Sequence, residues 1–139
     1  MIEDGGQYKI HLSGGDSGTG FRIHKFQLFP QKPGQETVEN TVVIYKNKQT
    51  SLSTSAITVD FNKDNILGAG TFHEGHGDSV ITNDVTIFDN EIFNQSIYLV
   101  HTDTVGILPV NFYLELEEVK MKDGEEAVVN FNAVLLHAE

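Results

Sequence analysis

The chain has 139 residues, no cysteine and a formal net charge of −11. This length corresponds to one domain, and a composition of 39% hydrophobic and 21% charged residues is globular, which excludes disordered, membrane-spanning and coiled-coil classes. Without cysteine there are no disulfides, thiolate metal sites or cysteine nucleophile. We therefore expect a single domain over residues 1–139 that folds in the cytoplasm, with no signal peptide.

The negative charge is concentrated in the second half of the chain. Residues 1–70 contain seven Lys/Arg and seven Asp/Glu, whereas residues 71–139 contain two and thirteen. Nucleic acids and anionic lipids are bound through clustered Lys and Arg, so neither is expected as a partner. The acidity serves either solubility or complementarity to a basic partner surface.

Apolar and polar residues alternate with period two along most of the chain, which is typical of half-buried antiparallel strands. Helical periodicity is almost absent. In chain order the pattern predicts about nine strands, near residues 7–12, 21–29, 41–46, 57–61, 66–72, 84–88, 96–101, 110–117 and 129–136.

These strands predict an all-β fold, an antiparallel β-sandwich with a jelly roll as its candidate topology. A change of apolar phase at His24-Lys25 predicts a β-bulge there, and the polar residues 47–54 predict a long loop or edge strand. The expected core contains Phe61, Ile97, Leu99, Phe112, Leu114, Leu116 and Phe131.

Two short motifs resemble catalytic or metal-binding signatures. Gly15-Asp16-Ser17-Gly18 spells the nucleophile tetrapeptide of chymotrypsin-like proteases, but there the serine follows the other triad members late in a chain of two barrels. The run His73-Glu74-Gly75-His76 is dense in possible ligands, yet two histidines three apart face opposite sides of a strand and no second cupin motif follows. We interpret them as a glycine-rich loop and an exposed turn.

Carboxylates form the other candidates for chemistry. Asp and Asn cluster near residues 62–65, 83–84 and 89–91, where turn formation is a stronger interpretation than a calcium site. Glu115 and Glu117 lie on one strand face about 7 Å apart by strand rise, a spacing compatible with a glycosidase pair. A solvated strand face is the simpler interpretation. We therefore predict no catalytic residue, no cofactor and no metal, and expect a protein that is not an enzyme.

Four segments resemble a known family. They are residues 50–61, Asn83-Asp84-Val85-Thr86-Ile87-Phe88-Asp89, Phe93-Asn94-Gln95-Ser96-Ile97-Tyr98-Leu99-Val100-His101 and Asn111-Phe112-Tyr113-Leu114-Glu115-Leu116-Glu117. These segments resemble sequences in the small virion structural proteins of marine tailed bacteriophages, those of cyanobacteria and their relatives. The resemblance implies a capsid-associated β-sandwich, most simply a head decoration or cement protein, with the virion as its location and the major capsid protein or other virion proteins as partners.

The resemblance does not identify the capsid-contacting residues, so we base a hypothesis about them on the distribution of charge along the chain. If the charge-balanced half faces the shell and the acidic half faces outward, the capsid-facing residues are Arg22, Lys25, Lys32, Lys46 and Lys48. Multivalent attachment to a repeating surface favours a homo-oligomer, most simply a trimer, or else a monomer placed between capsomers. The alternatives are a tail or fibre-base component or a host carbohydrate-binding module that uses tyrosines, and third a cupin-like metal enzyme.

Overall fold

A computed structural model describes residues 1–12, 19–33, 37–52, 59–75, 82–105, 108–122 and 125–135. Side chains are described in these ranges except at 82–83, 121–122 and 125–135. The described part of the chain contains eight strands and no helix. No helix that could cross a membrane occurs in these ranges.

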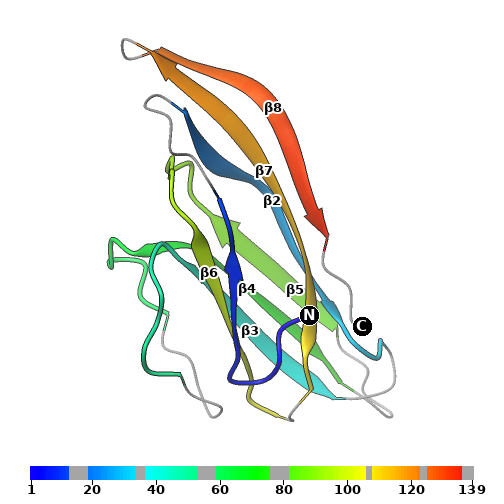
Figure 1. The fold of residues 1–139 in the computed structure, drawn as a ribbon. Coiled ribbons are helices and arrows are strands. Elements are labelled where there is room, and N and C mark those ends of the chain that lie inside the picture. The colour runs from blue at the N-terminus through cyan, green and yellow to red at the C-terminus, as the bar shows by residue number, and fades with distance from the viewer. Residues whose placement is uncertain are drawn as a thin grey trace.

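The strands form two antiparallel sheets (Figure 1). Each strand of the larger sheet pairs with its neighbours in the order β1-β6-β3-β4-β5, and the smaller sheet has the order β2-β7-β8. The larger sheet contains β1 (Gln7–Ile10), β6 (Ile97–Asp103), β3 (Val38–Tyr45), β4 (Ile66–Glu74) and β5 (Thr82–Phe88). The smaller contains β2 (Thr19–Pro30), β7 (Val110–Lys122) and β8 (Glu125–Leu135).

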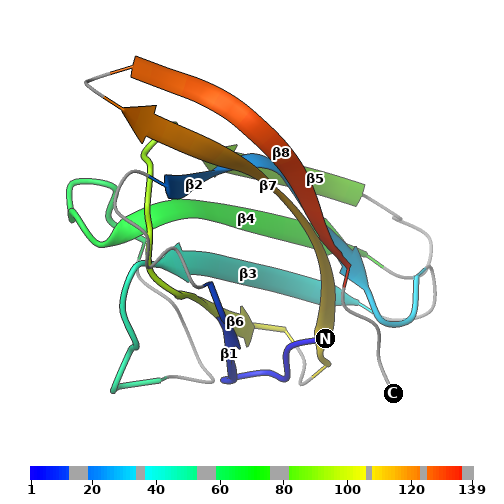
Figure 2. The same ribbon diagram turned by 45° about the horizontal axis from the view of Figure 1, so that its top comes forward.

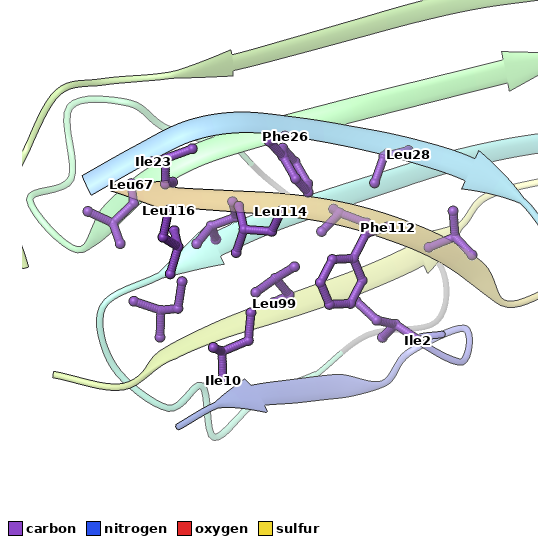
Figure 3. Close-up of a cluster of buried hydrophobic side chains, with 14 of the residues drawn as sticks. Ile2, Ile10, Ile23, Phe26, Leu28, Leu67, Leu99, Phe112, Leu114 and Leu116 are labelled. Carbon is purple, nitrogen blue, oxygen red and sulfur yellow. The ribbon is translucent and has the colours of Figure 1, made fainter. Parts of the chain in front are cut away.

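The two sheets face each other across one apolar core, which confirms the all-β, sandwich-like class (Figures 2 and 3). The alternation of β7 explains this packing, because Phe112, Leu114 and Leu116 project inward and are almost fully buried. Ile97 and Leu99 of β6 meet them from the other sheet. These five members of the predicted core are confirmed, and the side chain of Phe131 lies outside the described ones.

The predicted strand at residues 57–61 is wrong in its described part. Residues 59–60 are not in a strand, Phe61 starts a turn, and its side chain is 57% exposed instead of buried. The backbone bends here because the Asp60 side chain accepts a hydrogen bond from the Asn62 N–H at 3.0 Å. Without this strand, the described residues give eight strands where about nine were predicted.

The predicted bulge in β2 is confirmed. β2 pairs with β7 in regular register on both sides of His24, and the pairing shifts between Ile23 and Lys25. Because of the extra residue, Ile23 and Phe26 both point to the core although they are three positions apart. The bulge also leaves His24 exposed on the opposite face, above β7.

Candidate functional site

The outer face of β2 and β7 brings the candidate carboxylates Glu115 and Glu117 together with two of the proposed capsid-facing cations, Arg22 and Lys25. We call it the charged face, and it consists of Arg22, His24, Lys25, Tyr113, Glu115 and Glu117. β2 contributes the cations and β7 the acids, because the register places Arg22 opposite Glu117 and Lys25 opposite Glu115. Cross-strand pairs of opposite charge stabilise antiparallel sheets.

Glu117 lies at the centre of the charged face. Its Oε2 is 2.5 Å from Nε of Arg22, and its Oε1 is 2.8 Å from Nδ1 of His24. The residue is only 8% exposed, so the expectation of a fully solvated strand face is wrong here. The hydrogen bond from Arg22 is the main cause that lowers the pKa of the Glu117 carboxyl below its usual range.

Glu115 also has partners on this face. The hydroxyl of Tyr113 donates to Oε2 of Glu115 at 3.1 Å, which raises the pKa of that phenol. Nε2 of His24 lies 3.7 Å from the other oxygen of Glu115, so the imidazole lies between the two carboxylates and is closer to Glu117. Lys25 covers the Tyr113 ring with its Nζ 5.7 Å from the centroid.

These partners argue against a glycosidase pair at Glu115 and Glu117. Such a pair needs a general acid whose pKa is raised, whereas the pKa of Glu117 is lowered and both carboxylates already accept hydrogen bonds from within the chain. The sequence alone did not reveal the contact of His24 with Glu117. The sequence signal that could have identified it was the change of apolar phase that marks the bulge in β2.

The cations expected to face the capsid do not form one surface. Arg22 and Lys25 belong to the charged face, while Lys46 follows β3 in the other sheet and forms an ion pair with Glu91. Lys32, just after β2, and Lys48, after β3, are exposed.

The described strands do not separate the charge-balanced half of the chain from the acidic half in space. β2 pairs with β7, β1 and β3 pair with β6, and β4 pairs with β5. Strands from the two halves therefore pair with each other in both sheets, and Arg22 and Glu117 form an ion pair across one of these contacts.

The remaining motifs are placed only in part. Residues 13–18, with the Gly-Asp-Ser-Gly tetrapeptide, and His76 lie outside the described residues. His73 and Glu74 belong to β4 and are not in an exposed turn, and Glu74 is buried. No group of three or more His, Asp or Glu side chains that could hold a metal occurs in the described part of the chain. Asp89 accepts a hydrogen bond from the N–H of Glu91 at 2.9 Å, which confirms the turn interpretation there.

A buried polar cluster at the end of the core was not foreseen. His101 is fully buried on β6, with Nδ1 3.1 Å from the carbonyl of Glu3 and Nε2 2.8 Å from Oδ1 of Asn40. Nearby, Asp103 accepts hydrogen bonds from the N–H groups of Glu39, Val105 and Leu108. These bonds tie β3, β6 and the segment after β6 together, which is a structural role.

Comparisons with protein-family models, with curated proteins and with solved structures gave no match to this chain. The sequence and its geometry are therefore the basis for the function.

Proposed function

We propose that this chain is a non-enzymatic structural protein of a tailed-bacteriophage virion, most simply a decoration or cement protein on the outer surface of the head. The placement of three of the four family-like segments carries the proposal, while the fourth, residues 50–61, is described only at its two ends and forms no strand there. Residues 83–89, 93–101 and 111–117 lie on or beside β5, β6 and β7, and contain the core residues Ile97, Leu99 and Phe112. Sequence similarity in strand and core residues indicates a similar fold, and the function is inferred from that fold by analogy.

The charged face supports a non-enzymatic role. Its carboxylates are engaged by Arg22, His24 and Tyr113, and such cross-strand networks stabilise a sheet. A cement protein needs a rigid fold that binds one surface, and its location would be the virion after assembly in the host cytoplasm. Its partners would be the major capsid protein or other virion proteins, without nucleic acid or membrane.

We also propose a jelly-roll relationship for the sandwich. In a jelly roll, a long hairpin folds over so that strands pair in nested order. The pairs β4–β5, β3–β6 and β2–β7 follow this nesting. β8 departs from it, because it turns back on β7 while β1 pairs with β6.

The test of decoration is to mix the protein with undecorated capsids of its phage and to measure bound copies per particle. We expect saturable binding. Lys32 and Lys48, two exposed members of the five proposed capsid-facing cations, follow different strands, so Lys32→Glu and Lys48→Glu are tested singly, and the change that lies at the capsid contact should lower occupancy several-fold. Lys120→Glu, the same change at an exposed residue of β7, is the matched control and should bind normally. Failure of the unmodified protein to bind removes the decoration proposal.

A second candidate is a carbohydrate-binding module. Tyr45 of β3 and Tyr98 of β6 are cross-strand partners, both half-buried, and Nζ of Lys9 lies 5.8 Å from the Tyr98 ring. Adjacent planar rings suit sugar stacking. Tyr45→Ala should then abolish binding in a screen against host glycans, and a screen without any hit would remove this candidate.

A further inference from the structure

Among the residues that the structure describes, β5 is an edge strand without the features that usually protect the edge of a sheet. β1 is four residues long and contains Lys9, β2 is bulged and ends at Pro30, and β8 begins with two glutamates and is bulged where it pairs with β7. Short length, lysine, proline, charges and bulges all discourage pairing with a further strand. β5 has seven residues, pairs with β4 in regular register and carries a single charged residue, Asp84.

The hydrogen bonding of β5 identifies the groups at its open edge. The N–H of Asp89, just after the strand, donates to the carbonyl of Leu67 at 3.2 Å. Backbone groups of alternate residues point to the same side of a strand, so the odd-numbered residues of β5 face β4. The N–H and C=O groups of Asp84, Thr86 and Phe88 therefore point away from β4, toward the open edge.

An apolar row on the outer face of the larger sheet leads to this edge. Val100, Val43, Ala69 and Ile87 are successive cross-strand partners from β6 to β5. The first three are buried, but Ile87 is 55% exposed, and Val85 on the same face of β5 is 46% exposed. The apolar row thus ends in exposed side chains on β5, the strand whose outer backbone groups have no strand partner among the described residues.

We propose that β5 pairs antiparallel with β5 of a second copy of this chain, about a two-fold axis at Thr86, so that the larger sheets of both copies become continuous. In this register Thr86 faces Thr86 of the second copy, and the two residues exchange both backbone hydrogen bonds. Val85 lies opposite Ile87 of the second copy on the outer face, so the exposed apolar side chains cover each other.

Charge opposes the pairing of two copies least at this edge. Two molecules with a net charge of −11 repel each other, and they meet at lowest cost where few charges lie. The two-fold register puts Asp84 opposite Phe88 of the second copy. The two Asp84 carboxylates are then about 14 Å apart by strand geometry, which is beyond the Debye length at physiological salt.

Cysteine cross-linking tests both the pairing and its register. The natural chain has no cysteine, so each variant carries a single thiol. Opposed residues of a hydrogen-bonded pair have Cα atoms about 5.5 Å apart, within the range of a disulfide. Thr86→Cys should therefore form a disulfide-linked dimer under mild oxidation. Asp84→Cys, on the same strand and face, is the control and should cross-link at least about tenfold more slowly.

Sedimentation velocity tests the dimer without a cross-link. The unmodified chain should form dimers whose dissociation constant rises at least about tenfold in Ile87→Lys, because a charge replaces a side chain that the dimer buries. Thr71→Lys is the matched control, since Thr71 is exposed on the same face but lies on β4, away from the open edge. Circular dichroism checks that each variant is folded.

Two results would overturn the β5 dimer. One is a chain that stays monomeric at concentrations of about 100 μM, above the range of typical specific complexes. The other is equal cross-linking of Thr86→Cys and Asp84→Cys, which indicates random collision. Both experiments use the purified chain alone, so their outcome is independent of the virion proposal.

Discussion

Arg22 of β2 and Glu117 of β7 are direct cross-strand partners although 95 residues separate them, and Nε of Arg22 lies 2.5 Å from Oε2 of Glu117. This pair joins the charge-balanced part of the sequence to the acidic part. Reversing the charge of either residue breaks the same ion pair. Arg22 and Glu117 therefore cannot serve as independent probes of two faces, and exposed lysines are the better probes.

The Arg22–Glu117 pair should contribute measurably to stability. The folded-state pKa of Glu117 is lowered, so its contribution is present above the unfolded pKa of about 4.5 and is lost as the pH falls through the folded pKa. Because Arg22 is half-buried, we expect Arg22→Ala to cost about 1 kcal/mol at pH 7. Urea unfolding of Arg22→Ala, Glu117→Ala and the double variant should give a coupling energy that shrinks toward pH 3. A coupling energy independent of pH would contradict this assignment.

The core of β7 provides a stability prediction with an internal control. Phe112 is buried between the sheets (Figure 3). Its ring centroid lies 5.9 Å from that of Tyr8. Phe112→Ala should lower the free energy of unfolding by about 3–5 kcal/mol through lost burial and cavity formation. Phe61→Ala removes the same atoms from an exposed turn and should change it by less than about 0.5 kcal/mol. Similar losses in both variants would show that Phe61 is buried.

Phe112 and Phe61 also show how far alternation alone predicts the fold. The pattern around Phe112 belongs to a strand of 13 residues between two paired neighbours, so local preference and tertiary pairing agree. The pattern around Phe61 is equally regular, but in the structure its place is a turn next to Asp60. Alternation with period two predicts which residues would share a face of a strand. It does not predict whether a neighbouring strand is available for pairing.

The candidate site was less predictable than the fold. The carboxylates of Glu115 and Glu117 were correctly placed on one face, because side-chain direction follows from strand period. Their partners Arg22 and His24 depend on the register between β2 and β7, and the bulge at His24 shifts that register by one residue. Pairing between segments so distant in sequence cannot be read from either segment alone.

The carbonyl of Glu3 sets the proton position on His101. Nδ1 faces the Glu3 carbonyl, which can only accept, so this nitrogen carries the proton of a neutral ring. Burial is the main cause that lowers the pKa of His101, although Asp4 and Asp103 oppose it. When Oδ1 of Asn40 faces the His101 ring, Nδ2 of Asn40 is buried without a hydrogen-bond partner. Turning the side-chain amide over lets Nδ2 donate a hydrogen bond to the unprotonated Nε2 of His101.

The lowered pKa of His101 predicts acid sensitivity. Below about pH 6.5 the unfolded chain binds a proton at this residue that the folded chain excludes, so stability falls as the pH falls below that value. The maximum slope for one proton is about 1.4 kcal/mol per pH unit. His101→Gln keeps a donor for the Glu3 carbonyl and should show a shallower slope between pH 6.5 and 5 in urea unfolding. Identical slopes would mean that His101 is protonated in the folded protein.

Gly70 of β4 faces Phe26 and Leu28 of β2 across the core. A Cβ at this position would be 3.0 Å from Cε2 of Phe26, 3.1 Å from Cγ2 of Thr86 and 3.3 Å from Cδ1 of Leu28. The glycine therefore makes room for β2 above β4 and β5. We expect Gly70→Ala to cost about 1–3 kcal/mol, because an added methyl group in a packed core forces its neighbours away.

A second substitution separates overpacking from other effects of Gly70→Ala. Phe26→Leu removes the ring that meets the new methyl group, at a cost of its own in lost burial. If overpacking is the cause, the double variant should be more stable than the sum of the two single losses predicts, by about 0.5–3 kcal/mol as for other contacting pairs. Denaturant midpoints of the four proteins provide this coupling energy. Strict additivity would mean that the methyl group fits beside Phe26, so that the sheets are further apart at Gly70 than the distances indicate.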